Sequence, residues 1–429
     1  MEIKFLNYHT RLSHEDSLYW KELLFRTVKI GIEIEVALPM GQMKNAFLPA
    51  IIEELKPSED MNNLGENGVY NIISEHCGIE LQVIGRKPYF RTLHRQYKQI
   101  VDVLLSKKVR TLNTCGLHFH IMVFDLSEKV PDVIMANVWN ITKEYAPFLK
   151  FITSGGNRLS GLCRRRNYNS HLELEKITAG KLVVKDIYKM LKKSDSVPFH
   201  QNFLSLQPMT FNGEGLIDTF HYEYRFPDID ISPFSIVAKT FLFLAILLKA
   251  IELSQYGVLD PGNKRVSAEK WRLMNALSNN DGDLAASDTS SLTLEDIKKL
   301  KRGSKNLLRF LKPLFNRFEG NPSYEILEFL ADTPISMLRI HGLTWEEIEE
   351  MLSIQASRYY RTRDKIDENL IKCIELMECN DCETDSVWMR RVADSLQIDV
   401  DELSGRLKSI SIIRPIIWDE DLGSIIFSR

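Results

Sequence analysis

Four separate segments of the sequence alternate between apolar and polar residues. They are Lys29–Leu38 (KIGIEIEVAL), Cys77–Ile84 (CGIELQVI), Leu117–Phe124 (LHFHIMVF) and Thr219–Phe226 (TFHYEYRF). Successive side chains of a β-strand point to opposite faces of a sheet, so a period of two residues is the pattern of a strand. We therefore expect four strands, each with one apolar and one polar face.

The polar faces of these strands have an unusual composition. In chain order they carry Glu33 and Glu35, Glu80 and Gln82, His118 and His120, and Glu223 and Arg225. An antiparallel sheet with its polar face in water would explain any one of these strands. Carboxylates on neighbouring strands would, however, lie about 5 Å apart, and like charges so close are destabilising unless cations lie between them. Because oxygen-rich ligand sets suit hard divalent ions, the four strands together predict a Mg²⁺ or Mn²⁺ site.

The arginine two residues after Glu223 extends this prediction to polyphosphate. Divalent ions bridge phosphoryl oxygens, and an arginine stabilises the charge on a γ-phosphoryl group during its transfer. Arg225 stands where such an arginine is needed. The sequence contains neither a G-x-x-x-x-G-K-[ST] loop nor a kinase catalytic loop, which excludes the common nucleotide-binding folds at the level of motifs.

The rest of the chain has mainly helical periodicity. The pattern predicts helices over residues 15–26, 44–56, 89–107, 131–150, 233–254, 344–378 and 386–410, and a terminal hairpin over 410–427. The most apolar run, 241–248, is about half of the ~20 residues that a membrane span needs, so it predicts a buried helix. We expect an α+β fold in which a curved antiparallel sheet forms an active-site trough, is backed by helices, and is followed by a mostly helical C-terminal half.

A length of 429 residues accommodates two or three domains. We expect a catalytic sheet domain over 1–232, a helical region over 233–385 that completes or covers it, and a small helix–helix–hairpin module over 386–429. The segment 151–170 has neither period and contains four arginines, which predicts a loop, and loops of this length are often functional.

Charge and cysteine content restrict the partners and the compartment. The formal net charge is −3, so no overall attraction to nucleic acid or to a membrane is expected. The six cysteines are scattered, and the charged first twenty residues do not match an export signal. Both features favour a cytoplasmic location.

The motifs GIEIEV, GIELQV, CGLHFHI and YEYRFP, in this order, resemble those of the amidoligases. That family belongs with glutamate–cysteine ligase and glutamine synthetase to the carboxylate–amine ligase superfamily. The resemblance covers roughly residues 30–230, and CGLHFH is its most specific element. It implies an ATP-dependent ligase with two or three Mg²⁺ ions, or Mn²⁺ in their place. ATP phosphorylates a carboxylate, and an amine then attacks the acyl phosphate to form an amide.

The resemblance also implies roles for individual residues. The metal ligands are Glu33, Glu35, Glu80, His118 and Glu223, with His118 also a phosphate contact. Arg225 matches the γ-phosphate arginine, and His120 joins it as a catalytic residue. Arg164, Arg165 and Arg166 match an arginine–tyrosine region, with Arg165 assigned to catalysis and the other two to phosphate; which of them enters the site stays open. The carboxylate and amine substrates can be small molecules, peptides or proteins, and no oligomeric state is predicted.

Three other functions compete with this one. A zinc hydrolase could use the His-x-His strand, although the candidate carboxylates outnumber the ligands that one zinc ion requires. A ligase-derived binding protein without activity is the second. The third is DNA binding by residues 386–427, which loosely resemble a helix-turn-helix with a wing. Six Lys and Arg against seven Asp and Glu over 386–429 argue against DNA, because phosphate binding requires a positive excess.

Overall fold

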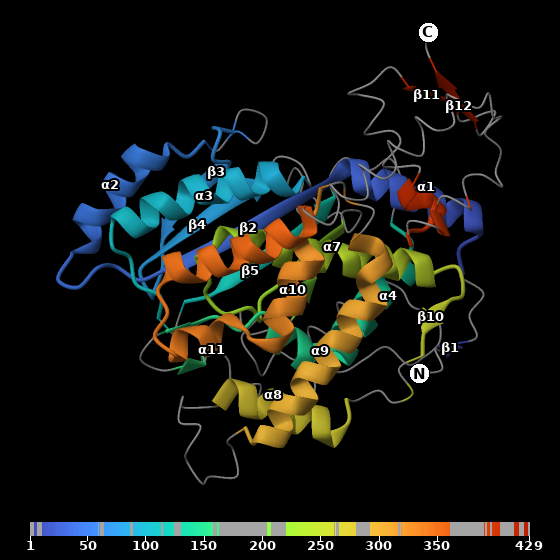
Figure 1. Cartoon of the computed structure of the whole chain (residues 1–429). Coiled ribbons are helices and arrows are strands. Elements are labelled where there is room, and N and C mark those ends of the chain that lie inside the picture. The colour runs from blue at the N-terminus through green and yellow to red at the C-terminus, as the bar shows by residue number, and fades with distance from the viewer. Residues whose placement is uncertain are drawn as a thin grey trace.

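The computed structural model of the chain describes residues 4–6, 11–58, 60, 64–85, 89–112, 115–123, 130–157, 161–162, 204–206, 220–260, 262, 266–279, 292–315, 318, 320–360, 390, 393–394, 397–403, 416–419 and 424–427. Over these residues the chain is an α+β protein (Figure 1). An antiparallel sheet is backed by helices, and most of the described chain after residue 233 is helical. The predicted fold class is confirmed.

The main sheet has six strands in the order β3-β4-β2-β5-β9-β8, and every neighbouring pair is antiparallel. Its strands are β2 (Val28–Val36), β3 (Val69–Ser74), β4 (Ile79–Gly85), β5 (Leu117–Val123), β8 (Leu204–Leu206) and β9 (Phe220–Tyr224). The four strands predicted from the alternating segments are β4, β2, β5 and β9. They are consecutive neighbours at the centre of the sheet, so their polar positions can meet.

The two edge strands were not predicted. Strand β3 lies in a segment that reads as a polar loop rich in Asn and Gly, and its register shifts between Val69 and Asn71. Such a bulge interrupts the period of two residues by which a strand is recognised. Strand β8 has three residues, too few to show a period.

The apolar face of the sheet forms part of the hydrophobic core. Ile32 and Ile34 of β2 lie opposite Val83 and Leu81 of β4, and all four are nearly inaccessible to solvent. On the neighbouring strands, Phe119 and Tyr224 both contact the ring of Phe243, with centroid distances of 5.0 and 4.1 Å. Burial of such side chains stabilises the protein by about 1.5–3 kcal/mol each.

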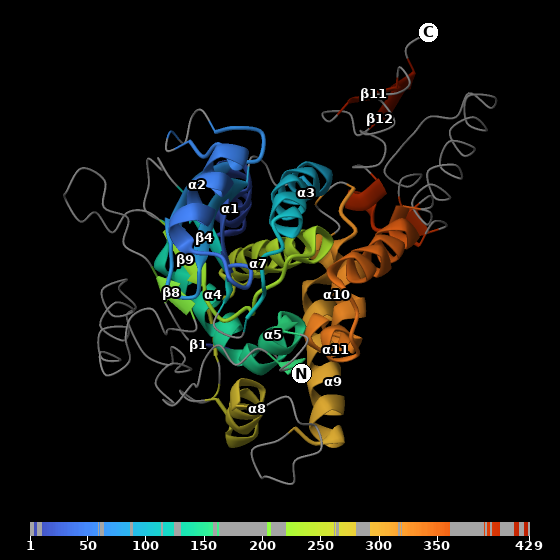
Figure 2. The same cartoon turned by 90° about the vertical axis from the view of Figure 1, so that its left-hand side faces the viewer.

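Phe243 belongs to α7, which lies on this face together with α3 and α4. The turned view in Figure 2 shows α3, α7, α9 and α10 on one side of the sheet. The helices are α1 (His14–Thr27), α2 (Lys44–Leu55), α3 (Phe90–Ser106), α4 (Asp132–Glu144), α5 (Ala146–Ile152), α7 (Pro233–Leu253), α8 (Ala268–Asn279), α9 (Leu294–Phe315), α10 (Ser323–Asp332), α11 (Ile335–Ile340) and a helix over 345–360. Helix α7 is long and apolar enough to cross a membrane, but it is mostly buried inside the protein as a core helix.

The prediction of one continuous helix over 131–150 is wrong. The helix is interrupted at Tyr145, which separates α4 from α5, and Pro147 lies in the first turn of α5. Proline has no N–H to donate and its ring clashes with the carbonyl four residues earlier, so a continuous helix would be strained there. The remaining predicted helices up to residue 360 are confirmed, whereas 361–378 and most of 386–410 lie outside the described residues.

Short two-stranded ribbons complete the fold. They pair β1 (Phe5–Leu6) with β10 (Val258–Leu259), β6 (Gly156–Asn157) with β7 (Gly161–Leu162), and β11 (Ile416–Asp419) with β12 (Ser424–Phe427). The last pair is the predicted terminal hairpin. The domain boundaries after residues 232 and 385 stay predictions.

Candidate metal centre

Strand register brings the predicted site residues together on one face of the sheet, here called the site face. Glu33 of β2 lies opposite His118 of β5, and Glu35 of β2 lies opposite Glu80 of β4. His120 of β5 lies opposite Glu223 of β9. These positions alternate with the apolar residues of the core, so the same pairing that buries the core gathers the acids and histidines on the other face.

The site face is not a surface that simply faces water. His118 and Glu223 are each 1% exposed, Glu35 and Glu80 6%, and His120 8%. Charged side chains are almost never buried so deeply without a partner. The water-facing explanation for the polar strand faces is therefore wrong.

His118 lies among three carboxylates. Its Nδ1 is 2.6 Å from Oε2 of Glu33 and 3.4 Å from Oε1 of Glu223. Its Nε2 is 3.7 Å from Oε1 of Glu35. A single imidazole thus contacts acids from two neighbouring strands, β2 and β9, which places it at the centre of the cluster.

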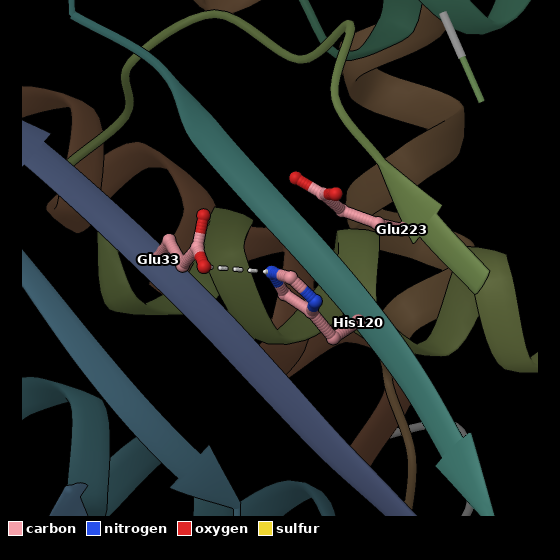
Figure 3. Close-up of side chains that lie close together, drawn as sticks. All are labelled: Glu33, His120 and Glu223. Atoms are coloured by element: carbon pink, nitrogen blue, oxygen red, sulfur yellow. Dashed lines mark ion pairs between the residues drawn. The ribbon is translucent and has the colours of Figure 1, made fainter. Parts of the chain in front are cut away.

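His120 contacts Glu33 from the other side. Its Nε2 is 3.4 Å from Oε1 of Glu33, and its Nδ1 is 2.9 Å from Nε2 of His221. Figure 3 shows Glu33, His120 and Glu223 projecting from three neighbouring strands on one face, with the Glu33–His120 ion pair dashed. Glu33 therefore lies between the two histidines of the His-x-His strand.

Further contacts orient the remaining acids. An oxygen of Glu223 accepts a hydrogen bond from Nη1 of Arg225, which directly follows β9. Glu35 accepts a hydrogen bond of 2.9 Å from the backbone N–H of Gly116. Glu80 accepts one of 3.0 Å from the side-chain amide of Gln82. Arg225 is thus the one arginine described in contact with the cluster.

The donor atoms fall into two groups that could each hold a metal ion. Glu33, Glu80 and His118 form the first triad, and Glu33, His120 and Glu223 form the second. Within each triad the ligand atoms lie within 4.8 Å of one another. Glu33 belongs to both, so two ions bound there would share its carboxylate. Each triad offers two carboxylates and one imidazole, a set that suits Mg²⁺ or Mn²⁺.

The pKa of Glu80 reflects its burial and the negative charge around it. Burial, followed by the negative charges of Glu33 and Glu35, raises the pKa of its carboxyl to about 7, although the hydrogen bond from Gln82 acts in the opposite direction. A carboxyl in this environment is destabilised when it ionises, and a divalent cation would remove that penalty. The donor set and its charge therefore fit a bound metal ion.

The two histidines act on Glu33 in the opposite way. Burial disfavours its charged form, but hydrogen bonds with His118 and His120 outweigh burial and hold the pKa of the Glu33 carboxyl well below its ordinary value. Burial likewise opposes the charged form of His120, yet Glu33 and Glu223 together raise its pKa. The two glutamates thus favour the protonated form of the His120 imidazole.

The chain directly after β9 is held by bonds to α5 and β5. Lys150 Nζ of α5 donates to the carbonyl oxygen of Phe226 at 2.8 Å and to Asp228 Oδ1 at 2.5 Å. The backbone N–H of Leu117, at the start of β5, donates to the carbonyl oxygen of Pro227 at 3.4 Å. These bonds fix the backbone that follows Glu223 and Arg225.

His221 was not predicted as a site residue. It shares the site face with Glu223 and Arg225 by the same alternation, and it lies within the predicted strand segment Thr219–Phe226, so the pattern of that segment carried the signal. Burial, followed by the charge of His120, lowers the pKa of His221 to about 3, so its ring is neutral. Arg164, Arg165 and Arg166 lie outside the described residues, and their roles stay predictions.

Comparison with known proteins gives a limited result. No protein-family model matches the sequence, and no curated protein matches it. Among the solved structures that match is a crystal structure of the complex between the prokaryotic ubiquitin-like protein Pup and its ligase PafA, at 10% identity, over 93% of this chain and 87% of that chain, with a TM-score of 0.39. A similarity at this level identifies neither a family nor an activity.

Proposed function

We propose that the protein is an ATP- and Mg²⁺-dependent carboxylate–amine ligase. The observation that carries the proposal is the pair of largely buried triads that share Glu33 on one face of an antiparallel sheet, with Arg225 in contact with Glu223. Paired divalent ions and an arginine are what a site needs to hold a triphosphate and stabilise phosphoryl transfer. The motif resemblance to the amidoligases supports the ligase reaction in particular.

In this proposal each triad holds one divalent ion, which supplies bonds to phosphoryl oxygens. Glu80 and His118 belong to one ion, His120 and Glu223 to the other, and Glu33 to both. One carboxylate oxygen of Glu35 accepts the hydrogen bond from the backbone N–H of Gly116. Glu35 therefore orients the cluster, or it adds a metal ligand with its other oxygen.

Arg225 contacts the γ-phosphoryl group and stabilises the charge that develops as the group is transferred. Its bond to Glu223 fixes the direction of the guanidinium before the nucleotide binds. Arg164, Arg165 and Arg166 are proposed as further contacts to phosphate or to the substrate carboxylate.

The reaction has two steps. A carboxylate oxygen of the first substrate attacks the γ-phosphorus of ATP, the bond to the β-phosphoryl oxygen breaks, and ADP leaves. The amine of the second substrate then attacks the acyl carbon, its proton is lost, and inorganic phosphate leaves as the amide forms. An amino acid, a peptide or a protein side chain is compatible as either substrate.

The arrangement of the histidines argues against a hydrolase built on one zinc ion. Over the described residues, no triad contains both His118 and His120: each histidine belongs with a different pair of acids. A single tetrahedral zinc ion held by the His-x-His strand would need both. Metal analysis of protein purified without chelator tests this directly, since tightly held stoichiometric zinc would favour hydrolysis.

The proposal is tested by screening pairs of carboxylates and amines for Mg²⁺-dependent ADP release, with mass spectrometry for the loss of water between partners. Glu33→Gln and Glu223→Gln should each abolish ADP release with the fold intact. Glu54→Gln is the matched control, because it makes the same change at an exposed glutamate of α2, which forms an ion pair with Lys107 away from the site. A fully active Glu33→Gln or Glu223→Gln variant would refute the proposed roles.

A further inference from the structure

His221 is a histidine of the site face that belongs to neither triad. It lies on β9 two residues before Glu223, and in the register of β5 and β9 it is opposite Met122, diagonal to His120. Its Nε2 lies 2.9 Å from Nδ1 of His120, and the two ring centroids are 5.2 Å apart. The two imidazoles are therefore joined edge to edge by a hydrogen bond across the strands.

A hydrogen bond between two neutral imidazoles needs one N–H and one lone pair. The other nitrogen of His120, Nε2, lies 3.4 Å from Glu33. It is therefore the nitrogen that His120 can offer to a metal ion in the second triad. A metal ion on Nε2 requires a lone pair there, so the neutral ring must carry its hydrogen on Nδ1. That hydrogen points at Nε2 of His221, which must then accept it.

The two contacts of the His120 ring fix this arrangement. Its Nε2 side faces Glu33 and its Nδ1 side faces His221. The Nδ1 atom of His221 is buried and has no hydrogen-bond partner in the described part of the chain, so this contact is its ring's one described polar bond.

We infer that His221 is a positioning residue for the second triad: it accepts the Nδ1 hydrogen of His120 and so presents Nε2 of His120 to a divalent cation. The inference rests on the proposed metal centre. Histidines that bind metals usually donate their second nitrogen to an oxygen acceptor, and loss of that acceptor weakens metal binding by about 10–100-fold. Here an imidazole takes the place of the usual carboxylate or carbonyl.

The test compares an acceptor with a non-acceptor at residue 221. In His221→Gln, the side-chain oxygen can reach the place of Nε2 and accept the hydrogen. In His221→Leu, the side chain has similar bulk but no atom that can accept this hydrogen. His221→Met is a second apolar variant, used if the leucine variant does not fold by circular dichroism. Each is made in the Glu80→Gln background, which removes a ligand from the first triad alone and leaves the second triad to be measured.

Mn²⁺ binding by calorimetry is the readout, and it needs neither ATP nor substrates. In the Glu80→Gln background, we expect His221→Leu to weaken Mn²⁺ binding by about 10–100-fold and His221→Gln to leave it close to that of the background. In a Glu223→Gln background, where the first triad is the one left complete, His221→Leu should leave Mn²⁺ binding unchanged.

The outcomes separate this inference from the proposed function. Mn²⁺ binding by the natural protein together with no effect of His221→Leu would overturn the role of His221 alone. Equal weakening by Leu and Gln would also overturn it, because the effect would then not depend on a hydrogen-bond acceptor. A natural protein that binds no Mn²⁺ would overturn the metal centre and the role of His221 with it.

Discussion

In the segment that follows β9, two aspartates are buried against two lysines, whereas on the site face three buried glutamates and the partly buried Glu33 lie beside one arginine and three histidines. The Lys239–Asp230 pair is 2.6 Å long and both side chains are fully inaccessible. The Lys150–Asp228 pair is equally buried at 2.5 Å. The two regions lie a few residues apart along the chain, on either side of Phe226.

The difference teaches that a buried charge is not in itself the sign of a functional site. Asp228 and Asp230 each have their own lysine, so the two pairs can have a purely structural role. Among the described residues in contact with the four glutamates of the site face, Arg225 is the one permanent cation. Burial, followed by the negative charges of Glu33 and Glu35, raises the pKa of Glu80. Burial together with this concentration of negative charge points to a cation site.

The largest expected effect is the loss of stability when a buried lysine–aspartate pair is broken. Lys239→Met leaves Asp230 buried without its cation, so we expect a loss of about 3–5 kcal/mol in the free energy of unfolding. Denaturant unfolding measures it. The double variant Lys239→Met/Asp230→Asn should recover much of the loss because no buried charge remains. An unchanged stability in the single variant would contradict the structural role of the pair.

On the site face, removal of a charged group should raise the free energy of unfolding instead of lowering it. The pKa of Glu80 is raised from 4.5 to about 7, so the folded protein binds this proton more tightly than the unfolded chain does. Stability of the metal-free protein should therefore fall as pH rises from 4.5 to 7. Glu80→Gln removes this loss, and at pH 8 it should stabilise the metal-free protein by up to about 3 kcal/mol.

The gain from Glu80→Gln should vanish near pH 4, where the glutamate is protonated in both states. Thermal unfolding at pH 4 and pH 8, with a chelator present, gives the comparison. A gain of equal size at both pH values would show that charge is not its cause.

Divalent metal should distinguish the two regions by a smaller amount. Mn²⁺ at ten times its dissociation constant stabilises the folded protein by about 1.4 kcal/mol for each bound ion. With two ions, we expect a gain of about 2.8 kcal/mol in the natural protein and in Lys239→Met/Asp230→Asn, whose site face is intact. Glu33→Gln should gain little, because Glu33 belongs to both triads. Equal gains in all three proteins would place the metal elsewhere.

An exposed ion pair sets the lower limit of the comparison. Lys98 and Asp102 are one helical turn apart on α3, and both side chains are more than half exposed. Asp102→Asn should change the free energy of unfolding by about 0.3–0.5 kcal/mol at most, and less at high salt. A larger change would mean that removing a charge alters the free energy of unfolding at any position. The effects in the two buried regions could then not be attributed to burial.

The sequence predicted the centre of the sheet better than its edges. Period-two alternation located β2, β4, β5 and β9 because each has one face in the core, whereas the bulge in β3 and the shortness of β8 removed that signal. The pairing partners of Glu33 and His120 could not be read from the sequence, since register depends on contacts between distant segments. His221 was missed although its position in the alternation placed it beside Glu223.

The matched lysine–aspartate pairs were beyond prediction for a similar reason. Lys150 and Lys239 lie in helices. Helical periodicity predicts only whether such a side chain is buried or exposed, and not which residue it contacts. Their partners follow β9 in the segment 226–231, which has no regular period. Only the packing of α5 and α7 against that segment brings the opposite charges together.

The central claim is that two divalent ions bind on the site face and share Glu33. The most direct test is the number of Mn²⁺ ions bound per chain, measured by titration calorimetry with Mg²⁺ as competitor. The account predicts two ions in the natural protein, one in Glu80→Gln, one in Glu223→Gln and none in Glu33→Gln. One ion that persists in Glu33→Gln, or a single tightly held zinc ion in place of both, would contradict it.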